Sequence, residues 1–259
     1  MTDVLLAARA DPTSTLVALD FDGTLAPIVS DPARAFAHPD AATALGELAA
    51  AGFRTAIVTG RPIRDVLGLG AGLAEVPGLV IYGHYGLEKW RDGRVSTPDE
   101  HPGVEPARRA VRELAVSRDG VTIEDKGHSV AVHTRNAPDA AAALAELRPA
   151  VEAIGAEHNL EVVPGRFVLE LRPAGIDKGA ALREVVTDTS ARTVVFAGDD
   201  LGDLPAIAAL RALPVTGIVV CSDSAETPAD LRAAADIVVD GPDGVVALLR
   251  ELAVPTTAH

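Results

Sequence analysis

The first 83 residues alternate short apolar runs with longer amphipathic segments. The runs 15–20, 53–60 and 78–83 are largely apolar and each contains Thr, Val or Ile, which predicts buried strands. Residues 40–51 lie between the first two runs and carry apolar positions at helical spacing, with Asp40 placed to cap the helix. Because strands and helices follow one another in turn, the pattern predicts a parallel sheet with helices on its faces.

The pattern changes after about residue 103. It predicts a helix, two adjacent strands, a second helix and a hairpin, at residues 104–116, 121–127, 129–135, 138–155 and 160–173. Pro149 lies inside the second helix, and we expect a kink or a break before it. The order αββαββ describes a small α+β module that interrupts the first alternation.

The first pattern returns from Lys178 onward. Helices are predicted at 178–187, 201–212, near 226–235 and at 243–252, and strands at 193–198, 216–221 and 236–240. We therefore expect an α/β protein. Its Rossmann-like parallel-sheet core would be formed by residues 1–102 and 174–259, with an α+β insertion at 103–173.

Composition bounds the class of protein. The 259 residues are 48% hydrophobic, enough for a large core and a smaller second domain. No apolar run reaches the roughly 18 residues that a membrane span needs, and residues 1–15 lack the basic start of a signal peptide. Cys221 is the single cysteine, which excludes an internal disulfide and fits a reducing compartment. We expect a soluble, cytoplasmic protein, and no segment demands a partner chain, which favours a monomer.

The charge balance constrains the partner. The formal net charge of −14 argues against nucleic acid or an anionic membrane surface as the main partner. An anionic substrate would then need positive charge supplied locally by its site. Only three of the 23 basic residues are lysines: Lys89, Lys126 and Lys178. A compact ammonium differs from a planar guanidinium, so these lysines could mark places where the fork of arginine would not serve; the alternative is that three lysines are kept by chance.

Two acidic clusters follow predicted core strands. Asp20 and Asp22 lie two residues apart at the end of the run 15–20, and Asp199 and Asp200 follow the strand 193–198. In open α/β sheets ligands bind at the carboxyl ends of the strands, where these carboxylates would converge and repel one another. A divalent cation relieves that repulsion, and oxygen-only ligands suit Mg²⁺. The alternative is that each aspartate caps the following helix.

Two further residues suggest a phosphate site. Lys178 begins a predicted helix, where the helix dipole disfavours a cation, so an anionic neighbour is expected unless the side chain is simply solvated. Thr59 ends a strand and offers a hydroxyl and a backbone N–H, although a turn residue is the plainer reading. With the aspartates, these residues predict phosphoryl transfer through an aspartyl phosphate, in which a second acid protonates the leaving group. No P-loop, G-x-S-x-G or H-E-x-x-H motif is present.

The motifs resemble a known superfamily. "DFDGT" (20–24), "TGR" (59–61), Lys178 and "GDD" (198–200) occur in the order of the four motifs of haloacid-dehalogenase-like (HAD) phosphatases. Further stretches are similar to the trehalose-6-phosphate phosphatases of that superfamily, so that the resemblance covers about residues 13–240: "YGHYGLE", "IEDKGHSVAVHTR" and "FVLELRPAGIDKG". The resemblance implies that 103–173 is a cap domain that selects the sugar.

The resemblance implies a role for each motif residue. Asp20 would attack phosphorus, and Asp22 would protonate the leaving sugar oxygen and then activate water. Thr59 and Lys178 would hold the phosphate. Mg²⁺ would be bound by the Asp20 carboxylate, the Asp22 backbone carbonyl and Asp199, with support from Asp200 or Asp203. Substrate would be contacted by seven further residues: Gly60, Arg61, His84, Tyr85, Glu124, Lys126 and Glu170.

Plainer readings stay open for several of these residues. Glu124 and Glu170 could face outward from half-exposed strands, Lys126 could belong to a turn, and His84 and Tyr85 could be turn or hinge residues. The sequence also departs from the family in two places. "GDDLGD" stands where GDD-x-TDE is common, and "GHYG" puts Tyr85 where the family usually has histidine.

The implied reaction is hydrolysis of trehalose 6-phosphate to trehalose and phosphate. The first alternative is another sugar phosphate, such as sucrose phosphate or mannosyl phosphoglycerate. The second is a sensor that binds a sugar phosphate without turnover. A sensor would be expected to have lost Asp20 or Asp22, and both are present.

Overall fold

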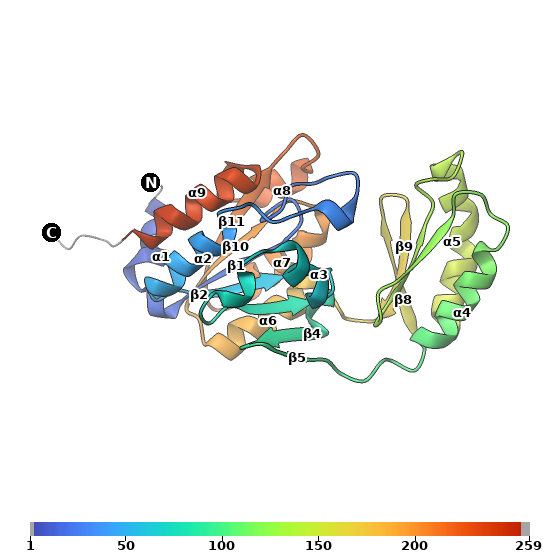
Figure 1. The fold of residues 1–259 in the computed structure, drawn as a ribbon, viewed down its shortest axis with the longest axis horizontal. Helices are drawn as coiled ribbons and strands as arrows, with labels where there is room; N and C mark the ends of the chain where they lie inside the picture. The colour runs from blue at the N-terminus through green and yellow to red at the C-terminus, as the bar shows by residue number, and fades with distance from the viewer. Residues whose placement is uncertain (1–2, 255–259) are drawn as a thin grey trace. The chain divides into compact units, whose positions relative to one another are not determined.

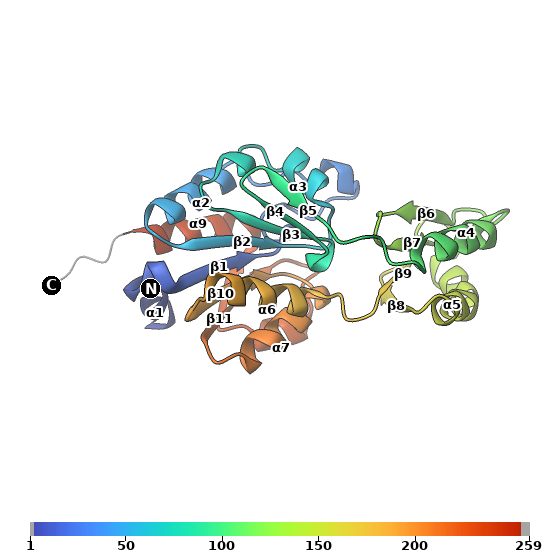
Figure 2. The ribbon, with the colours of Figure 1, turned by 90° about the horizontal axis from the view of Figure 1, so that it is seen from below.

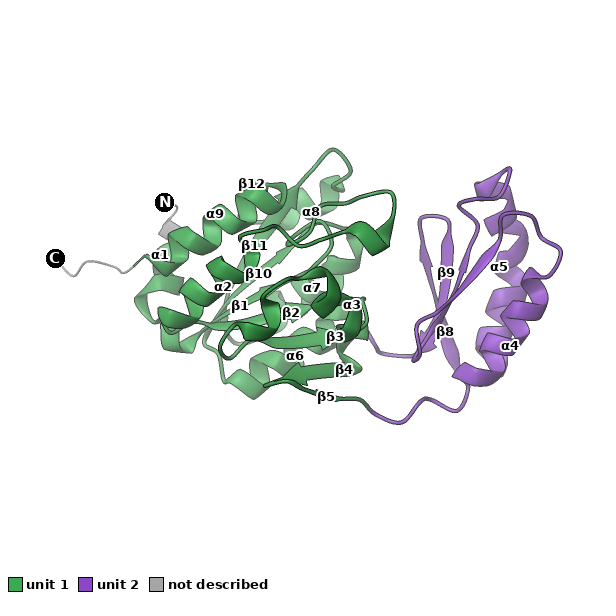
Figure 3. Cartoon of the chain, in the orientation of Figure 1, with its two compact units in different colours: residues 1–97, 177–259 green, residues 98–176 purple. Residues whose placement is uncertain are grey.

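The structure, a computed structural model, describes residues 3–254. The chain divides into two compact units, residues 1–97 with 177–259 and residues 98–176 (Figure 3). The predicted alternation is confirmed: an α/β unit is interrupted by an α+β unit. No helix of residues 3–254 is long and apolar enough to cross a membrane.

The first unit is built on one eight-stranded sheet (Figure 1). Across the sheet the strands are β12 (Ile237–Asp240), β11 (Thr216–Asp223), β10 (Thr193–Gly198), β1 (Thr15–Leu19), β2 (Arg54–Val58), β3 (Val80–Gly83), β4 (Glu88–Arg91) and β5 (Arg94–Ser96). Strands β12 to β3 run parallel. β1 is buried along its whole length because both of its faces are covered, which explains its continuous apolar sequence.

Two antiparallel strands were not predicted. β4 and β5 form a hairpin that extends the sheet beyond β3. Asp92 and Gly93 join the two strands with φ angles of 51° and 76°, the left-handed values of a two-residue hairpin turn. An Asp-Gly pair between two short alternating stretches is the signal that could have revealed this hairpin.

Helices cover both faces of the sheet. One face is covered by α1 (Asp3–Ala10), α2 (Ala41–Ala50), α3 (Ile63–Leu69) and α9 (Gly241–Ala253). The other is covered by α6 (Lys178–Thr189), α7 (Leu204–Ala212) and α8 (Ala229–Ala234), and Figure 2 shows α2 and α9 opposite α6 and α7. Short 3₁₀ turns lie at Pro12–Ser14, Pro32–Arg34, Leu73–Glu75, His84–Gly86 and Leu201–Asp203.

The second unit has the predicted order αββαββ. Its elements are α4 (Val104–Ala115), β6 (Thr122–Asp125), β7 (Val130–His133), α5 (Ala140–Glu157), β8 (Leu160–Gly165) and β9 (Val168–Pro173). The strands form an antiparallel sheet in the order β6-β7-β9-β8. Val111 of α4 and Val151 of α5 pack with Val130, Val132 and Leu171 of the sheet to make its core.

The expected break before Pro149 is wrong. α5 runs without interruption from Ala140 to Glu157 with Pro149 inside it. Proline removes only its own N–H from the helical ladder. Leu147 and Val151, on either side of Pro149, are buried in the core of this unit, and that packing holds the two halves in one helix.

Candidate active site

Three predicted site residues follow three neighbouring strands. Asp199 comes directly after β10, Asp20 after β1 and Thr59 after β2. β1 pairs with both neighbours, and Leu19 lies opposite Ala197 on one side and Ile57 on the other. The parallel register therefore brings these side chains to one edge of the sheet, where ligands bind in open α/β folds.

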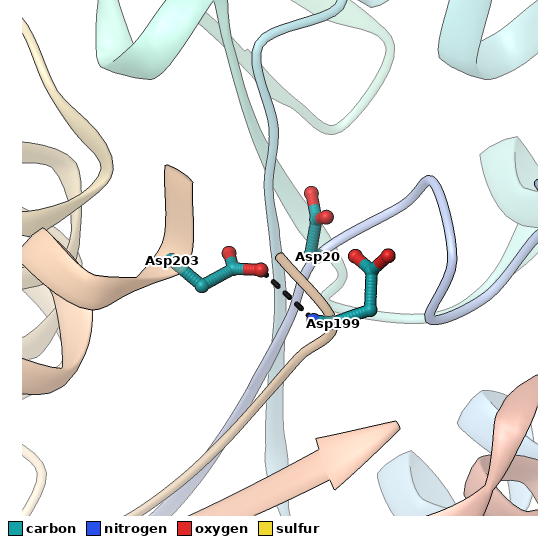
Figure 4. Close-up of side chains that lie close together, drawn as sticks. All are labelled: Asp20, Asp199 and Asp203. Carbon is teal, nitrogen blue, oxygen red and sulfur yellow. Dashed lines mark hydrogen bonds between the residues drawn. The ribbon is translucent and has the colours of Figure 1, made fainter. Parts of the chain in front are cut away.

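Three aspartates form a buried acidic cluster. Asp20, Asp199 and Asp203 each offer a carboxylate oxygen, and these oxygens lie within 4.8 Å of one another (Figure 4). Burial raises the pKa of Asp199 to about 8, and the nearby Asp203 and Asp200 add to the shift. Burial also raises the pKa of Asp20 well above its ordinary value. Such a cluster is stabilised only by a cation or a bound proton.

Lys178 supplies positive charge to the cluster. Its Nζ lies 2.8 Å from Oδ1 of Asp20 and 2.7 Å from Oδ1 of Asp203. Burial alone would lower the pKa of Lys178, yet the charges of Asp20 and Asp203 raise it well above its ordinary value, so the lysine is protonated. The anionic neighbour expected for a lysine at a helix N-terminus is thus present. Asp177 caps the start of the same helix, because its Oδ1 accepts a hydrogen bond of 2.7 Å from the Ala180 amide.

Asp203 connects the members of the cluster through hydrogen bonds that its carboxylate accepts. Its Oδ1 accepts the hydrogen bond of Lys178, and its Oδ2 accepts from the amides of Asp199 (2.9 Å) and Asp200 (3.2 Å). Asp200 instead caps the turn Leu201–Asp203, because its Oδ1 accepts from the Gly202 amide at 2.8 Å. Of the two residues expected to support a metal, Asp203 lies in the cluster and Asp200 has the capping role.

The cluster fits a hard divalent cation. All of its ligand atoms are carboxylate oxygens, the type that Mg²⁺ and Ca²⁺ prefer. Both oxygens of Asp203 are already bonded and Oδ1 of Asp20 contacts Lys178, so Asp199 and the other oxygen of Asp20 are left to bind an ion. Gly23 allows the Asp199 carboxylate to lie close to the backbone of the turn after β1. It has φ +71°, and a Cβ there would lie 2.0 Å from Oδ2 of Asp199, so only glycine lets this carboxylate lie over the turn.

Asp22 is held apart from the cluster by Arg61. Nε and Nη2 of Arg61 each donate a hydrogen bond of 2.6 Å to the two oxygens of Asp22, and Nη2 also donates to the Pro32 carbonyl at 3.0 Å. Burial alone would lower the pKa of Arg61, yet bonding to Asp22 raises it above its ordinary value. Arg61 was expected to contact substrate. In the structure its guanidinium group binds the carboxylate of Asp22.

Thr59 can offer its hydroxyl but not its amide. The Thr59 N–H donates to the Tyr82 carbonyl at 2.9 Å, which corrects the expectation that this N–H would face a phosphate. Its Oγ1 accepts from the Arg61 amide at 3.1 Å. Since that bond uses the oxygen only as an acceptor, the hydroxyl proton remains to be donated.

The turn His84–Gly86 braces the turn that carries Thr59. The Tyr85 amide donates to the Thr59 carbonyl and the His84 amide donates to the Arg61 carbonyl, both at 2.9 Å. Tyr85 has φ 58°, and its ring lies so close to Gly60 that a Cβ on Gly60 would be 2.7 Å from the ring. His84 is buried, with Nδ1 3.3 Å from Oε1 of Glu88.

Glu88 is a residue that the sequence did not reveal. Its Oε2 accepts a hydrogen bond of 2.7 Å from the amide of Ile63, the first residue of α3. It therefore links the turn of His84 to the start of the helix that follows the Thr59–Arg61 turn.

The second unit brings its three predicted sugar-binding residues together. Nζ of Lys126 lies 3.3 Å from Oε2 of Glu170 and 4.0 Å from Oε2 of Glu124. Ser129 and His133 were missed: Ser129 Oγ donates to Oε1 of Glu170 at 2.6 Å, and His133 Nε2 lies 2.8 Å from Glu124 Oε2.

Arg108 supports the turn that contains Lys126. It is buried, its Nη2 donates to the Gly127 carbonyl at 2.7 Å, and its Nε lies 2.9 Å from Oδ2 of Asp125. The signal was available in the sequence, because Arg108 lies four residues after Val104 and three before Val111, on the apolar face of α4.

Known proteins resemble this chain along most of its length. A family model described as trehalose-phosphatase matches residues 18–237. The trehalose-phosphate phosphatase of Mycobacterium avium (strain 104) is 36% identical over 221 residues, which are 79% of this chain and 53% of that protein. The chain thus spans about half the length of this curated relative.

Solved structures share the fold. Trehalose-6-phosphate phosphatase of Aspergillus fumigatus has a TM-score of 0.72 at 21% identity, covering 96% of each chain. A haloacid dehalogenase-like hydrolase from Bacteroides thetaiotaomicron has a TM-score of 0.66 at 19% identity, covering 92% of this chain and 99% of its own. At these identities the likeness concerns the fold.

Proposed function

The chain belongs to the trehalose-phosphatase family and has the haloacid dehalogenase-like fold, and from that membership we propose that it is a Mg²⁺-dependent phosphatase that hydrolyses trehalose 6-phosphate to trehalose and phosphate. One observation carries the proposal. Protonated Lys178 bridges Asp20 and Asp203 beside Asp199, at the carboxyl ends of β1 and β10. This arrangement unites a nucleophile, a cation and carboxylates that can bind a metal.

The reaction proceeds in two displacements at phosphorus. A carboxylate oxygen of Asp20 attacks phosphorus, and the bond from phosphorus to the sugar oxygen breaks. Asp22 first takes up a proton from solvent in place of one of its two hydrogen bonds to Arg61, and it donates that proton to the leaving sugar oxygen. Asp22, now ionised, accepts a proton from the water that attacks the aspartyl phosphate. Phosphate leaves and free Asp20 is restored.

Lys178 and Thr59 hold the phosphoryl group during both steps. The ammonium of Lys178 already contacts Asp20, so it lies beside any phosphorus that this carboxylate attacks. The Thr59 hydroxyl donates a hydrogen bond to a phosphate oxygen. Both contacts favour the transition state because the charge on the transferred group is spread over its outer oxygens.

Asp20, Asp199 and the backbone carbonyl of Asp22 would hold Mg²⁺, with Asp203 fixing Asp199 through its amide. When bound, the ion neutralises phosphate charge and the mutual repulsion of the aspartates. The donor set described above suits this ion, which supports the assignment.

Residues 103–173 act as the cap that selects the sugar. Glu124, Lys126 and Glu170 form one polar group on the sheet of the second unit, and carboxylates with an ammonium can bond the hydroxyls of a neutral disaccharide. The clustering of these three side chains supports a shared role.

A substrate panel tests the proposal. Phosphate release is measured for trehalose 6-phosphate, sucrose 6-phosphate, mannosyl phosphoglycerate and glucose 6-phosphate at equal concentration, with Mg²⁺ and with EDTA. Trehalose 6-phosphate should be preferred by orders of magnitude in kcat/KM, and EDTA should abolish release. Preference for another sugar phosphate overturns the substrate assignment. No release from any of them, with Mg²⁺ present, leaves the sensor as the better interpretation.

A further inference from the structure

A pocket lies at the edge of the core sheet, away from the cluster of Asp20, Asp199 and Asp203. It has a volume of about 570 Å³ and is lined by β3, β4, β5 and the end of α6. The pocket includes Asp188, ten residues after Lys178 on α6. At a rise of 1.5 Å per residue the two positions are roughly 15 Å apart, so this hairpin pocket is a separate site.

The register of the strands gathers three cations on one face of the sheet. Arg91 lies directly opposite Arg94, and Lys89 lies directly opposite Ser96. Directly opposed side chains share a face, so the two guanidinium groups are neighbours. Behind them, Tyr82 pairs with Lys89 and Val80 with Arg91, which gives the cations an apolar floor.

The opposed arginines are only partly neutralised within the protein. Like charges directly opposite each other destabilise a strand pair. Nη2 of Arg91 forms a long ion pair of 4.0 Å with Oδ2 of Asp188, whereas Arg94 makes no ion pair with any residue of the described range 3–254. Asp92 and Asp188 are the two carboxylates that line the pocket. Lys89, by contrast, is paired with Glu184. Two adjacent guanidinium groups, one of them without an ion pair in the described range, thus lie at this edge of the sheet in a chain of net charge −14.

We propose that the hairpin pocket binds a small organic phosphate. Two planar guanidinium groups side by side match the oxygens of a phosphoryl dianion, and the Ser96 hydroxyl lies one pair further along the same face. Tyr82 and Val80 line the pocket beneath the side chains of the hairpin and are 2% and 6% exposed, so the organic part contacts only their outer atoms. Asp188, already bonded to the Tyr82 hydroxyl at 3.0 Å, forms the opposite wall and accepts from a ligand hydroxyl.

The single tryptophan of the chain reports on this pocket. Trp90 lies between Lys89 and Arg91 in β4, lines the pocket and packs into the core on the other face of the sheet. Phenylphosphonate is a suitable ligand for titration because it has a ring and a phosphoryl dianion but no ester bond to hydrolyse. Benzyl alcohol is its neutral counterpart.

Trp90 fluorescence is titrated with phenylphosphonate at low ionic strength in the unmodified protein and three variants. A saturable change is expected, and Arg91→Gln and Arg94→Gln should each weaken apparent binding at least about tenfold. Arg250→Gln, an exposed arginine of α9, is the matched control and should titrate like the unmodified protein. Benzyl alcohol should give no saturable response.

Three outcomes overturn the proposal. They are no saturable change, equal binding by the arginine variants and the unmodified protein, and a change that is lost in Lys178→Met but kept in Arg94→Gln. The last outcome would place the ligand at the aspartate site. Phosphate release measured on the same samples keeps this result distinct from the proposed function, because the fluorescence titration requires no turnover.

Discussion

Arg61 fixes the carboxylate of Asp22 with two hydrogen bonds of 2.6 Å each, one to each oxygen. The same guanidinium donates to the Pro32 carbonyl, so its own position is set from a third direction. Arg61 thereby aims the proposed proton donor, which makes it a positioning residue.

Arg61→Lys should lower kcat for the sugar phosphate by about 10- to 100-fold, because an ammonium cannot bind both oxygens of Asp22 at once. KM should change less than kcat. Steady-state kinetics with trehalose 6-phosphate measures both, and Arg64→Lys, an exposed neighbour, is the control. A variant with raised KM and normal kcat would show that Arg61 contacts substrate instead.

Gly60→Ala should destabilise the protein by about 1–3 kcal/mol, since its new Cβ would lie 2.7 Å from the Tyr85 ring. Adding Tyr85→Ala should recover most of that loss, a coupling that chemical denaturation of the two single variants and the double variant would measure. Gly68→Ala is the matched control. No atom lies within 4 Å of a Cβ there, and a helical position should gain up to about 1 kcal/mol from the change.

Stability should depend on pH and Mg²⁺ together. The pKa of the Asp199 carboxyl rises from 3.8 to about 8 on folding, so the folded protein holds a proton that the unfolded chain has released. Without metal, this group therefore costs stability as the pH rises between these values. Mg²⁺ must displace that proton and should bind more tightly as the pH approaches 8.

We expect Mg²⁺ to raise the melting temperature more at about pH 8.5 than at about pH 6. Thermal denaturation with Mg²⁺ or EDTA at the two pH values tests this. Asp199→Asn should remove most of the difference. An increase that is equal at both pH values, or larger at the lower one, would contradict the assignment of the cluster as a metal site.

Asp203→Asn should lower the free energy of unfolding by about 2–4 kcal/mol in EDTA. An amide has one acceptor oxygen, so it cannot serve both Lys178 and the amides of Asp199 and Asp200. Urea denaturation gives the value. Asp200→Asn should cost far less, because asparagine caps a helical turn as well as aspartate does. Similar losses in the two variants would refute the central role of Asp203.

Ser129→Ala should raise KM about tenfold while kcat changes little. It removes the hydrogen bond of 2.6 Å that orients Glu170, a proposed sugar ligand. Ser129→Thr, which keeps the hydroxyl, should restore KM. If alanine lowered kcat with KM unchanged, Ser129 would act on the chemical step and the sugar-binding role of Glu170 would lose its support.

The sequence allowed the strand-end residues to be predicted because a parallel sheet brings every carboxyl end to one edge. Asp20, Asp199 and Lys178 meet for that reason. The partners of individual side chains were harder to predict from the sequence. Whether Arg61 turned to Asp22 or to a ligand depended on the loop that carries Pro32, and no periodicity fixes that loop.

Tertiary packing decided other features. Pro149 stays within one helix because buried neighbours hold it there, a contribution that local propensity omits. The hairpin β4–β5 carries polar residues on one face and only Trp90 deep in the core, so its apolar pattern was too weak to identify a strand.

The hairpin β4–β5 determines which strand forms one edge of the core sheet. β5 is three residues long and wholly exposed, and β12 at the opposite margin has four residues. Unpaired edge strands invite another chain to add to a sheet, and short strands with charged side chains discourage it. Arg94 and Asp240 place opposite charges at the two margins, on strands too short to template a growing ladder. Both edges of the core sheet are therefore poor templates for the addition of a strand from another chain.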